Sequence, residues 1–194
     1  MELLICTSNL HKLEEIKSYT GADFKLISFR DLKGFKHPLE DSYTFQGNAL
    51  IKAKAGYKKT GVISIGDDSG LEVLSLGHRP GVFSARYAGE NATDAENNNK
   101  LLKELNGVKD RRARFVSSMA MVGPKKTIVV MGAVDGIILE QPKGKNGFGY
   151  DPLFYIPDLG KTMAELTIEE KNSISHRGKA LKKLSQELLK LKNV

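Results

Sequence analysis

The chain has 194 residues, of which 40% are hydrophobic, so it can bury a substantial core. Lysine and arginine number 30 against 23 aspartates and glutamates, and the resulting net charge of +7 favours anionic partners. The single cysteine, Cys6, excludes an intrachain disulfide framework. No apolar run approaches the ~20 residues of a membrane span and no secretory signal is visible, so we expect a cytoplasmic protein without a membrane partner.

The first part of the chain predicts two strands and two helices. An apolar run at 3–7 is typical of a buried strand, and apolar residues then recur at helical spacing up to Gly21, where a helix can stop. Residues 25–29 predict a second strand. Thr44 caps a second helix, whose apolar stripe runs over residues 45–57.

The middle of the chain predicts a strand and a third helix. The apolar run at 62–66 is typical of a buried strand that leads into Asp-Asp-Ser-Gly at 67–70, with Leu71 onward continuing the strand or pairing with it. Thr93 and Glu96 form a capping box at the start of a helix. Gly107 closes that helix.

The last part predicts a long hairpin and a final helix. Residues 113–122 and 127–139 flank a Gly-Pro-Lys-Lys turn. The final helix has one apolar stripe, made of Ile174, Leu181, Leu184, Leu188 and Leu191. Interspersed helices and strands with a hairpin predict an α/β fold with a mixed sheet. Without linkers or repeats, we expect one domain over 1–194.

The turn after the first predicted strand is a candidate anion site. Its residues are Thr7, Ser8, Asn9, Leu10, His11 and Lys12. Free backbone N–H groups at a helix start, together with the helix dipole, favour an anion, and Lys12 adds a full charge. The turn lacks the glycines of a Walker loop. The alternative is an ordinary helix cap with a surface lysine.

The tandem carboxylates Asp67 and Asp68 follow a buried strand. They are costly to bury and repel each other unless a metal or a lysine lies nearby. Neighbours in a strand point to opposite faces, so the two need not share a role. One of them could hold Mg²⁺ and accept a proton from an attacking water. The alternative is an Asp-rich turn.

A second acidic pair, Glu40 and Asp41, lies in the polar stretch before the second helix. Mg²⁺ takes one or two carboxylates together with substrate phosphates, so one of these residues could complete a site with Asp68. Lys52, in the second helix, could reach a phosphate. The alternatives are an exposed acidic loop and a solvated lysine.

Two stretches near the C-terminus suit a purine. Phe148 lies between two glycines and could stack on a base, a contact worth ~1–3 kcal/mol. Asp151 could accept hydrogen bonds from ring N–H groups. His176 and Arg177 could donate to a 6-keto oxygen, and Lys171 is a third donor nearby. The alternative is a core phenylalanine beside a basic helix start.

Six blocks in order carry a family resemblance. They are TSNLHK at 7–12, TFQGNALIKA at 44–53, DDSGL at 67–71, PGVFSARYAGENATD at 80–94, GFGYDP at 147–152 and ELTIEEKNSISHRGKAL at 165–181. With these blocks the chain resembles the inosine/xanthosine triphosphate pyrophosphatase family over nearly its whole length. The resemblance implies an elongated mixed α/β sheet flanked by helices, in which two lobes enclose a substrate cleft. It also implies a homodimer.

The activity that the resemblance implies is Mg²⁺-dependent hydrolysis of non-standard purine triphosphates, such as ITP, dITP and XTP, to the monophosphate and pyrophosphate. Carried over by motif, Asp68 is the proton acceptor and a metal ligand, with Glu40 as the second ligand and Asp41 as the alternative. Gly47 stands where many relatives carry an acid. The implied substrate-binding residues are Thr7, Ser8, Asn9, Leu10, His11, Lys12, Lys52, Ser69, Phe148, Gly149, Tyr150, Asp151, Lys171, His176 and Arg177.

Water would then attack the α-phosphorus while Asp68 takes its proton, leaving Asp67 a structural, electrostatic or second-ligand role. Arg177 would reject adenine, whose 6-amino group donates where the arginine also donates; how guanine is rejected stays open. Two rivals remain. One is a nucleic-acid-binding protein, suggested by the net charge and the arginines at 111–114. The other is a pyrophosphatase for modified pyrimidine triphosphates.

Overall fold

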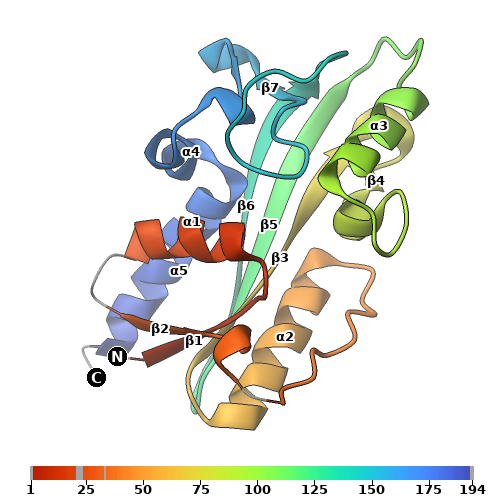
Figure 1. Cartoon of the computed structure of the whole chain (residues 1–194). Coiled ribbons are helices and arrows are strands. Elements are labelled where there is room, and N and C mark those ends of the chain that lie inside the picture. The colour runs from red at the N-terminus through yellow and green to blue at the C-terminus, as the bar shows by residue number, and fades with distance from the viewer. Residues whose placement is uncertain (1, 21–23, 33, 193–194) are drawn as a thin grey trace.

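A mixed β-sheet organises the protein (Figure 1). The computed structural model describes residues 2–20, 24–32 and 34–192, so the helix stop predicted at Gly21 lies outside the described residues. These residues form an eight-stranded sheet of order β2-β1-β3-β5-β6-β7-β8, with β4 pairing to β3. The strands are β1 (Glu2–Cys6), β2 (Lys25–Ser28), β3 (Ser64–Val73), β4 (Arg79–Pro80), β5 (Arg112–Val122), β6 (Thr127–Ile138), β7 (Phe154–Ile156) and β8 (Lys161–Thr162).

Strands β1, β2 and β3 run parallel, whereas β3, β5 and β6 are antiparallel, so the predicted mixed α/β sheet is confirmed. The helices are α1 (Leu10–Thr20), α2 (Phe45–Thr60), α3 (Asp94–Glu104), α4 (Ile168–Ile174) and α5 (His176–Lys192). No described helix is long and apolar enough to cross a membrane.

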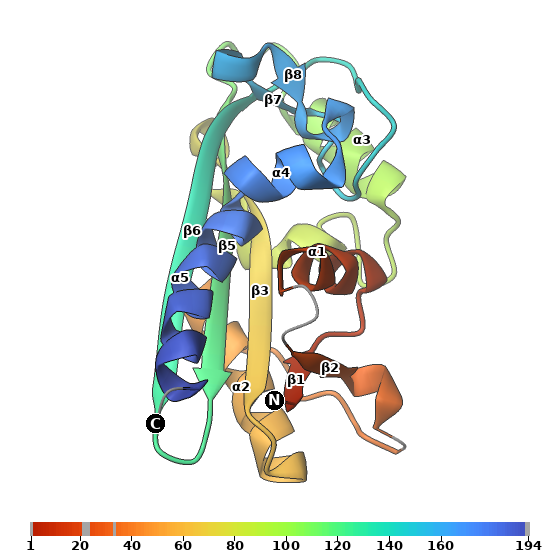
Figure 2. The same ribbon diagram turned by 90° about the vertical axis from the view of Figure 1, so that its left-hand side faces the viewer.

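Two helices cover opposite faces of the long strands. Gly66 in β3 and Gly132 in β6 mark the closest approaches, since a Cβ at either position would collide with helix backbone, at Ala49 of α2 and at His176 of α5. Figures 1 and 2 show β1, β2 and α2 at one end of the long strands and β7, β8, α3 and α4 at the other, which gives the two lobes.

The relative lengths of β1 and β3 create an open edge between the lobes. β1 ends at Cys6, which pairs with Gly66, whereas β3 continues to Val73 and meets β4 only from Glu72. The Asp-Asp-Ser-Gly segment at 67–70 therefore lies within β3 and not in a turn after it, because ten registered pairs with β5 carry the strand through. At this edge Asp68, Ser69 and Gly70 border a cavity, whereas Asp67 is buried.

The structure confirms the predicted helix caps and the predicted hairpin. Thr44 caps α2 by accepting from the Gly47 N–H, Thr93 and Glu96 form their capping box, and the long hairpin is β5 and β6. The single helix predicted to include Ile174 is wrong. Ser175 adopts an extended conformation that separates α4 from α5, although Leu181, Leu184 and Leu188 of the predicted stripe pack into the core; the side chain of Leu191 lies outside the described residues.

Candidate active site

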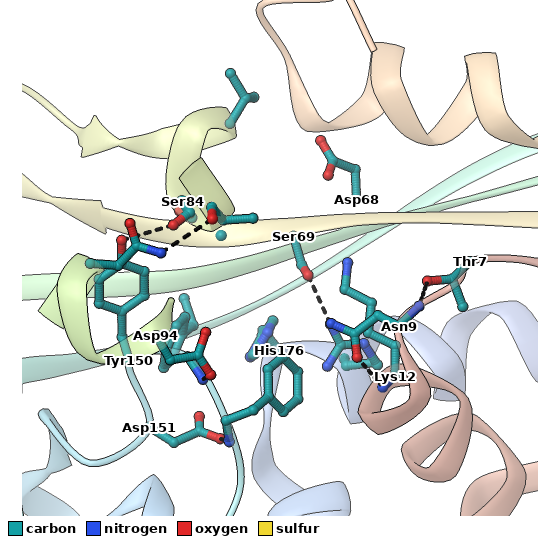
Figure 3. Close-up of a pocket in the computed structure, with 18 of the residues that line it drawn as sticks. Thr7, Asn9, Lys12, Asp68, Ser69, Ser84, Asp94, Tyr150, Asp151 and His176 are labelled. Atoms are coloured by element: carbon teal, nitrogen blue, oxygen red, sulfur yellow. Dashed lines mark hydrogen bonds between the residues drawn. The ribbon is translucent and has the colours of Figure 1, made fainter. Parts of the chain in front are cut away.

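A cavity of about 320 Å³ lies at the open edge of β3. It brings together every predicted site residue except Leu10, whose side chain is 52% exposed, and His11. His11 instead lines a neighbouring cavity of about 430 Å³ between α1 and α4. Figure 3 shows Thr7, Asn9 and Lys12 gathered at one end of the site, and Asp94, Tyr150 and Asp151 at the other.

The turn between β1 and α1 is pinned by short-range hydrogen bonds. Thr7 Oγ1 accepts from the Asn9 N–H at 3.1 Å, and Asn9 Oδ1 accepts from the Lys12 N–H at 3.2 Å. Asn9 therefore acts as the N-cap of α1. The helix start borders the cavity with its dipole directed at it, as an anion-binding turn requires.

Asp67 is buried in a cationic environment. Its carboxylate lies 2.7 Å from Lys12 Nζ and 3.3 Å from the Arg177 guanidinium, and it also accepts from Ser117 Oγ at 2.8 Å. Burial alone would raise the pKa of Asp67, but Arg177 and Lys12 outweigh it and hold the pKa well below its ordinary value. Asp67 is thus a fixed anion, unsuited to accepting a proton.

Asp68 lies on the other face of β3, toward α2 (Figure 3). Its Oδ2 accepts from Asn48 Nδ2 at 3.1 Å, and its Oδ1 lies 3.5 Å from Lys52 Nζ. Burial raises the pKa of Asp68 above its ordinary value, although Lys52 and Lys12 oppose the shift. Of the tandem pair, Asp68 is therefore the better general base.

Glu40 completes a cluster with Lys52 and Asp68. Its Oε2 lies 2.7 Å from Lys52 Nζ, so one ammonium serves both carboxylates. Asp41 is exposed and does not line the cavity. Burial works against the charged form of Lys52, but Asp68 and Glu40 outweigh it and raise its pKa.

The donor set at this cluster fits Mg²⁺, which takes oxygen ligands from one or two carboxylates and completes its shell with water and phosphate. Among the described residues no group of three or more His, Cys, Asp or Glu side chains could hold a metal by itself. Gly47 adds no acid, and a Cβ there would collide with Ser42. Glu40 and Asp68 are thus the candidate ligands.

A buried chain of alternating charges links the two ends of the site. Lys171 Nζ lies 2.7 Å from both Asp151 and Glu15, and Glu15 also pairs with Arg177, which reaches Asp67. Lys12 pairs with Asp67 and extends the chain to three anions and three cations in alternation. Each charge therefore has a partner of opposite sign, as buried charges require. Glu15 is the shared centre of this chain.

Arg177 is less free to bind a base than the sequence predicts. Its terminal nitrogens donate to Glu15, Asp67 and Ser69, the last at 2.7 Å, and its Nε lacks a partner within the described residues. His176 stacks on Phe115, and its Nδ1 also lacks a partner there. Burial, aided by Arg177, lowers the pKa of His176 well below its ordinary value, so the imidazole is neutral. Two buried nitrogens on residues that line the cavity thus lack a partner among the described residues.

Phe148 lies on a loop shaped by Gly147 and Gly149, which have φ values of +77° and +60°. Its ring stacks on His11 with centroids 5.2 Å apart, and Lys171 Nζ lies 4.8 Å from the ring centroid. The sequence assigned His11 to the phosphate end, but the structure places its ring beside Phe148.

The sequence did not reveal the residues that hold the predicted site residues in place by hydrogen bonds and ion pairs. Glu15 could be found only as the residue one turn after Lys12, on the same helix face. Asn48 was visible in the quoted TFQGNA block, and Asp94 ended another block, yet neither was given a role. Asn98, which donates to the Gly149 carbonyl at 2.9 Å, carried no signal.

Comparison with known proteins identifies the family. The sequence profile of the Ham1 family matches residues 3–187. The chain belongs to the Ham1 family. A Thermoanaerobacter sp. (strain X514) protein named dITP/XTP pyrophosphatase is 50% identical, with 98% of each chain covered.

Solved structures of Ham1 proteins share this fold. The Staphylococcus aureus Ham1 protein superposes with a TM-score of 0.88 at 43% identity, covering 97% of this chain and 98% of that one. A HAM1 protein from Coxiella burnetii gives 0.89 at 41% identity, covering 98% and 99%. The predicted fold class and family are confirmed.

The arginines at 111–114 have internal partners. Arg111 donates to three backbone carbonyls, Arg112 pairs with Asp110 at 2.8 Å, and Arg114 pairs with Asp135 at 2.6 Å. The donors that motivated a nucleic-acid surface are therefore engaged within the protein.

Proposed function

We propose that this protein hydrolyses non-standard purine nucleoside triphosphates, with dITP, ITP and XTP as candidates, to the monophosphate and pyrophosphate. The observation that carries the proposal is one cavity with an acid–lysine centre at one end and an aromatic ring with buried donors at the other. The name of the Thermoanaerobacter relative, dITP/XTP pyrophosphatase, supports the same substrate class.

At the phosphate end, the start of α1, Lys12 and Lys52 orient the triphosphate, and Asp68 accepts the proton of the attacking water. Asp67 keeps Lys12 and Arg177 in place without titrating. Mg²⁺ held by Glu40 and Asp68 would offset the negative charge of the phosphates.

At the base end, Phe148 stacks on the purine, and Asp151 accepts from ring N–H groups. Arg177 Nε and the neutral His176 face a 6-keto base in this proposal. Adenine, with a 6-amino donor, leaves these buried groups unpaired, which can cost a factor of ~10⁴ in discrimination.

The rest of the proposal concerns the assembly. The chain acts as one catalytic unit over 1–194, it forms a homodimer, and it works in the cytoplasm without nucleic acid or membrane partners.

The test is steady-state release of pyrophosphate from a panel of triphosphates with Mg²⁺. The panel holds ITP, dITP, XTP, ATP, GTP and a modified pyrimidine triphosphate. We expect kcat/KM for ITP, dITP and XTP to exceed the value for ATP by about 10³ or more. Equal rates on all purines would contradict the proposed selectivity, and a preference for the pyrimidine would favour the other pyrophosphatase class.

A further inference from the structure

Helix α3 holds the loop that carries the stacking ring. The N–H of Gly149 donates to Asp94 Oδ2 at 2.6 Å, and the carbonyl of Gly149 accepts from Asn98 Nδ2 at 2.9 Å. Asp94 and Asn98 are four residues apart on α3 and so lie on the same side of the helix. One helix thus grips one residue of the loop through both of its backbone polar groups.

These two hydrogen bonds bear on the position of the Phe148 ring, because Phe148 lies between two glycines. Gly147 and Gly149 both have positive φ, a region that glycine enters freely and other residues avoid. Phe148 borders both the site cavity and the neighbouring cavity between α1 and α4. Within the loop the Phe148 N–H donates to Asp151 Oδ2 at 2.8 Å, and the contacts from α3 fix the backbone on the other side of the ring, at Gly149.

Further hydrogen bonds hold α3 and the loop to the segment that precedes α3. Asn97 of α3 is buried, accepts from the Ala88 N–H at 2.8 Å and donates to the Ala85 carbonyl at 3.2 Å. The Tyr150 hydroxyl donates to the Ser84 carbonyl at 2.9 Å. The segment before α3 therefore joins the helix and the loop into one body, as a preorganised site requires.

We propose that Asp94 and Asn98 are positioning residues for base recognition, which fix the plane of Phe148 before a purine binds. This inference rests on the proposed function. A loop that is held in place before binding loses less conformational entropy when the purine binds. We therefore expect these two residues to affect the affinity for the nucleoside part of the substrate. Neither residue takes part in the chemistry at Asp68.

The test compares Asn98→Asp and Asp94→Ala with Asn99→Ala, a matched control on the exposed side of α3. Asn98→Asp places a carboxylate against the Gly149 carbonyl. Isothermal titration calorimetry measures binding of IMP and, separately, of inorganic pyrophosphate. We expect IMP affinity to fall about tenfold in both variants, with pyrophosphate affinity and kcat within about twofold of wild type. The KM for ITP rises with the loss of IMP affinity.

The outcomes separate the two claims. Unchanged IMP affinity in Asn98→Asp, or an equal loss of pyrophosphate affinity, overturns the positioning role while wild-type hydrolysis of ITP upholds the proposed function. If the wild type neither binds IMP nor hydrolyses ITP, both fail. Thermal melts check folding; should Asp94→Ala lose its fold through the first turn of α3, Asn98→Asp alone decides.

Discussion

Asp67 and Asp68 are neighbours in β3 whose carboxylates serve opposite faces of the strand. Asp67 faces Lys12 and Arg177, and Asp68 faces Asn48 and Lys52. Burial raises the pKa of Asp68 because Lys52 and Lys12 only partly oppose it, whereas at Asp67 the charges of Arg177 and Lys12 outweigh burial and lower the pKa. When the environments of two neighbouring carboxylates push their pKa values apart, the direction of each shift indicates which carboxylate can accept a proton.

Asparagine at each position separates these roles. Asp68→Asn should fold normally and lose about 10² or more in kcat for ITP, because the proton acceptor is gone. Asp67→Asn should instead lower the free energy of unfolding by about 3 kcal/mol, since it leaves buried cations without their anion. Pyrophosphate release and urea unfolding measure the two effects. Near-wild-type activity in Asp68→Asn would show that another group takes the proton.

Glu15 gives the protein an acid-sensitive contribution to stability. Burial alone would raise its pKa, but Arg177 and Lys171 lower it to about 2 from an ordinary 4.5. A depressed folded-state pKa means that the contribution is fully present above about pH 4.5 and is lost as pH falls through 2. The shift corresponds to roughly 3 kcal/mol.

Urea unfolding between pH 6 and pH 2 checks this with Glu15→Gln and the matched control Glu14→Gln, whose side chain is exposed. In the control, the free energy of unfolding should fall with pH as it does in the wild type. Glu15→Gln should be less stable at pH 6 and should lose less stability as the pH falls. Parallel curves for all three proteins would exclude Glu15 as the source.

The site's chemistry was more predictable from sequence than its supporting contacts. Strand ends, capping signals and the hairpin follow from local patterns, and the acidic pair and Phe148 stand out as costly or exposed residue types. Glu15 becomes buried only when α1 meets α4 and α5, and Ser175 breaks a helix whose apolar period continues. Such features depend on packing between distant segments, which no local pattern encodes.

The Mg²⁺ requirement tests the second ligand. Glu40→Gln should raise the Mg²⁺ concentration for half-maximal activity about tenfold or more, because a neutral amide is a weaker ligand for a hard cation. Asp41→Asn is the control, since Asp41 is exposed next to Glu40 and does not line the cavity. If the control shifts the titration and Glu40→Gln does not, the upstream ligand is Asp41.

Arg177 tests how the base is read. Arg177→Lys keeps a cation near Glu15 and Asp67 but loses the guanidinium Nε. The ratio of kcat/KM for ITP over ATP should fall about tenfold, which corresponds to one charged hydrogen bond of about 1.4 kcal/mol. An unchanged ratio in a folded variant would mean that the keto group is recognised elsewhere.

The central claim is that water attacks the α-phosphorus of a non-standard purine triphosphate in this cavity. Hydrolysis of ITP in ¹⁸O-labelled water with Mg²⁺, followed by mass spectrometry of the products, tests it directly. The account predicts IMP carrying one labelled oxygen and unlabelled pyrophosphate. Labelled pyrophosphate, release of IDP with phosphate, or no turnover of ITP would contradict it.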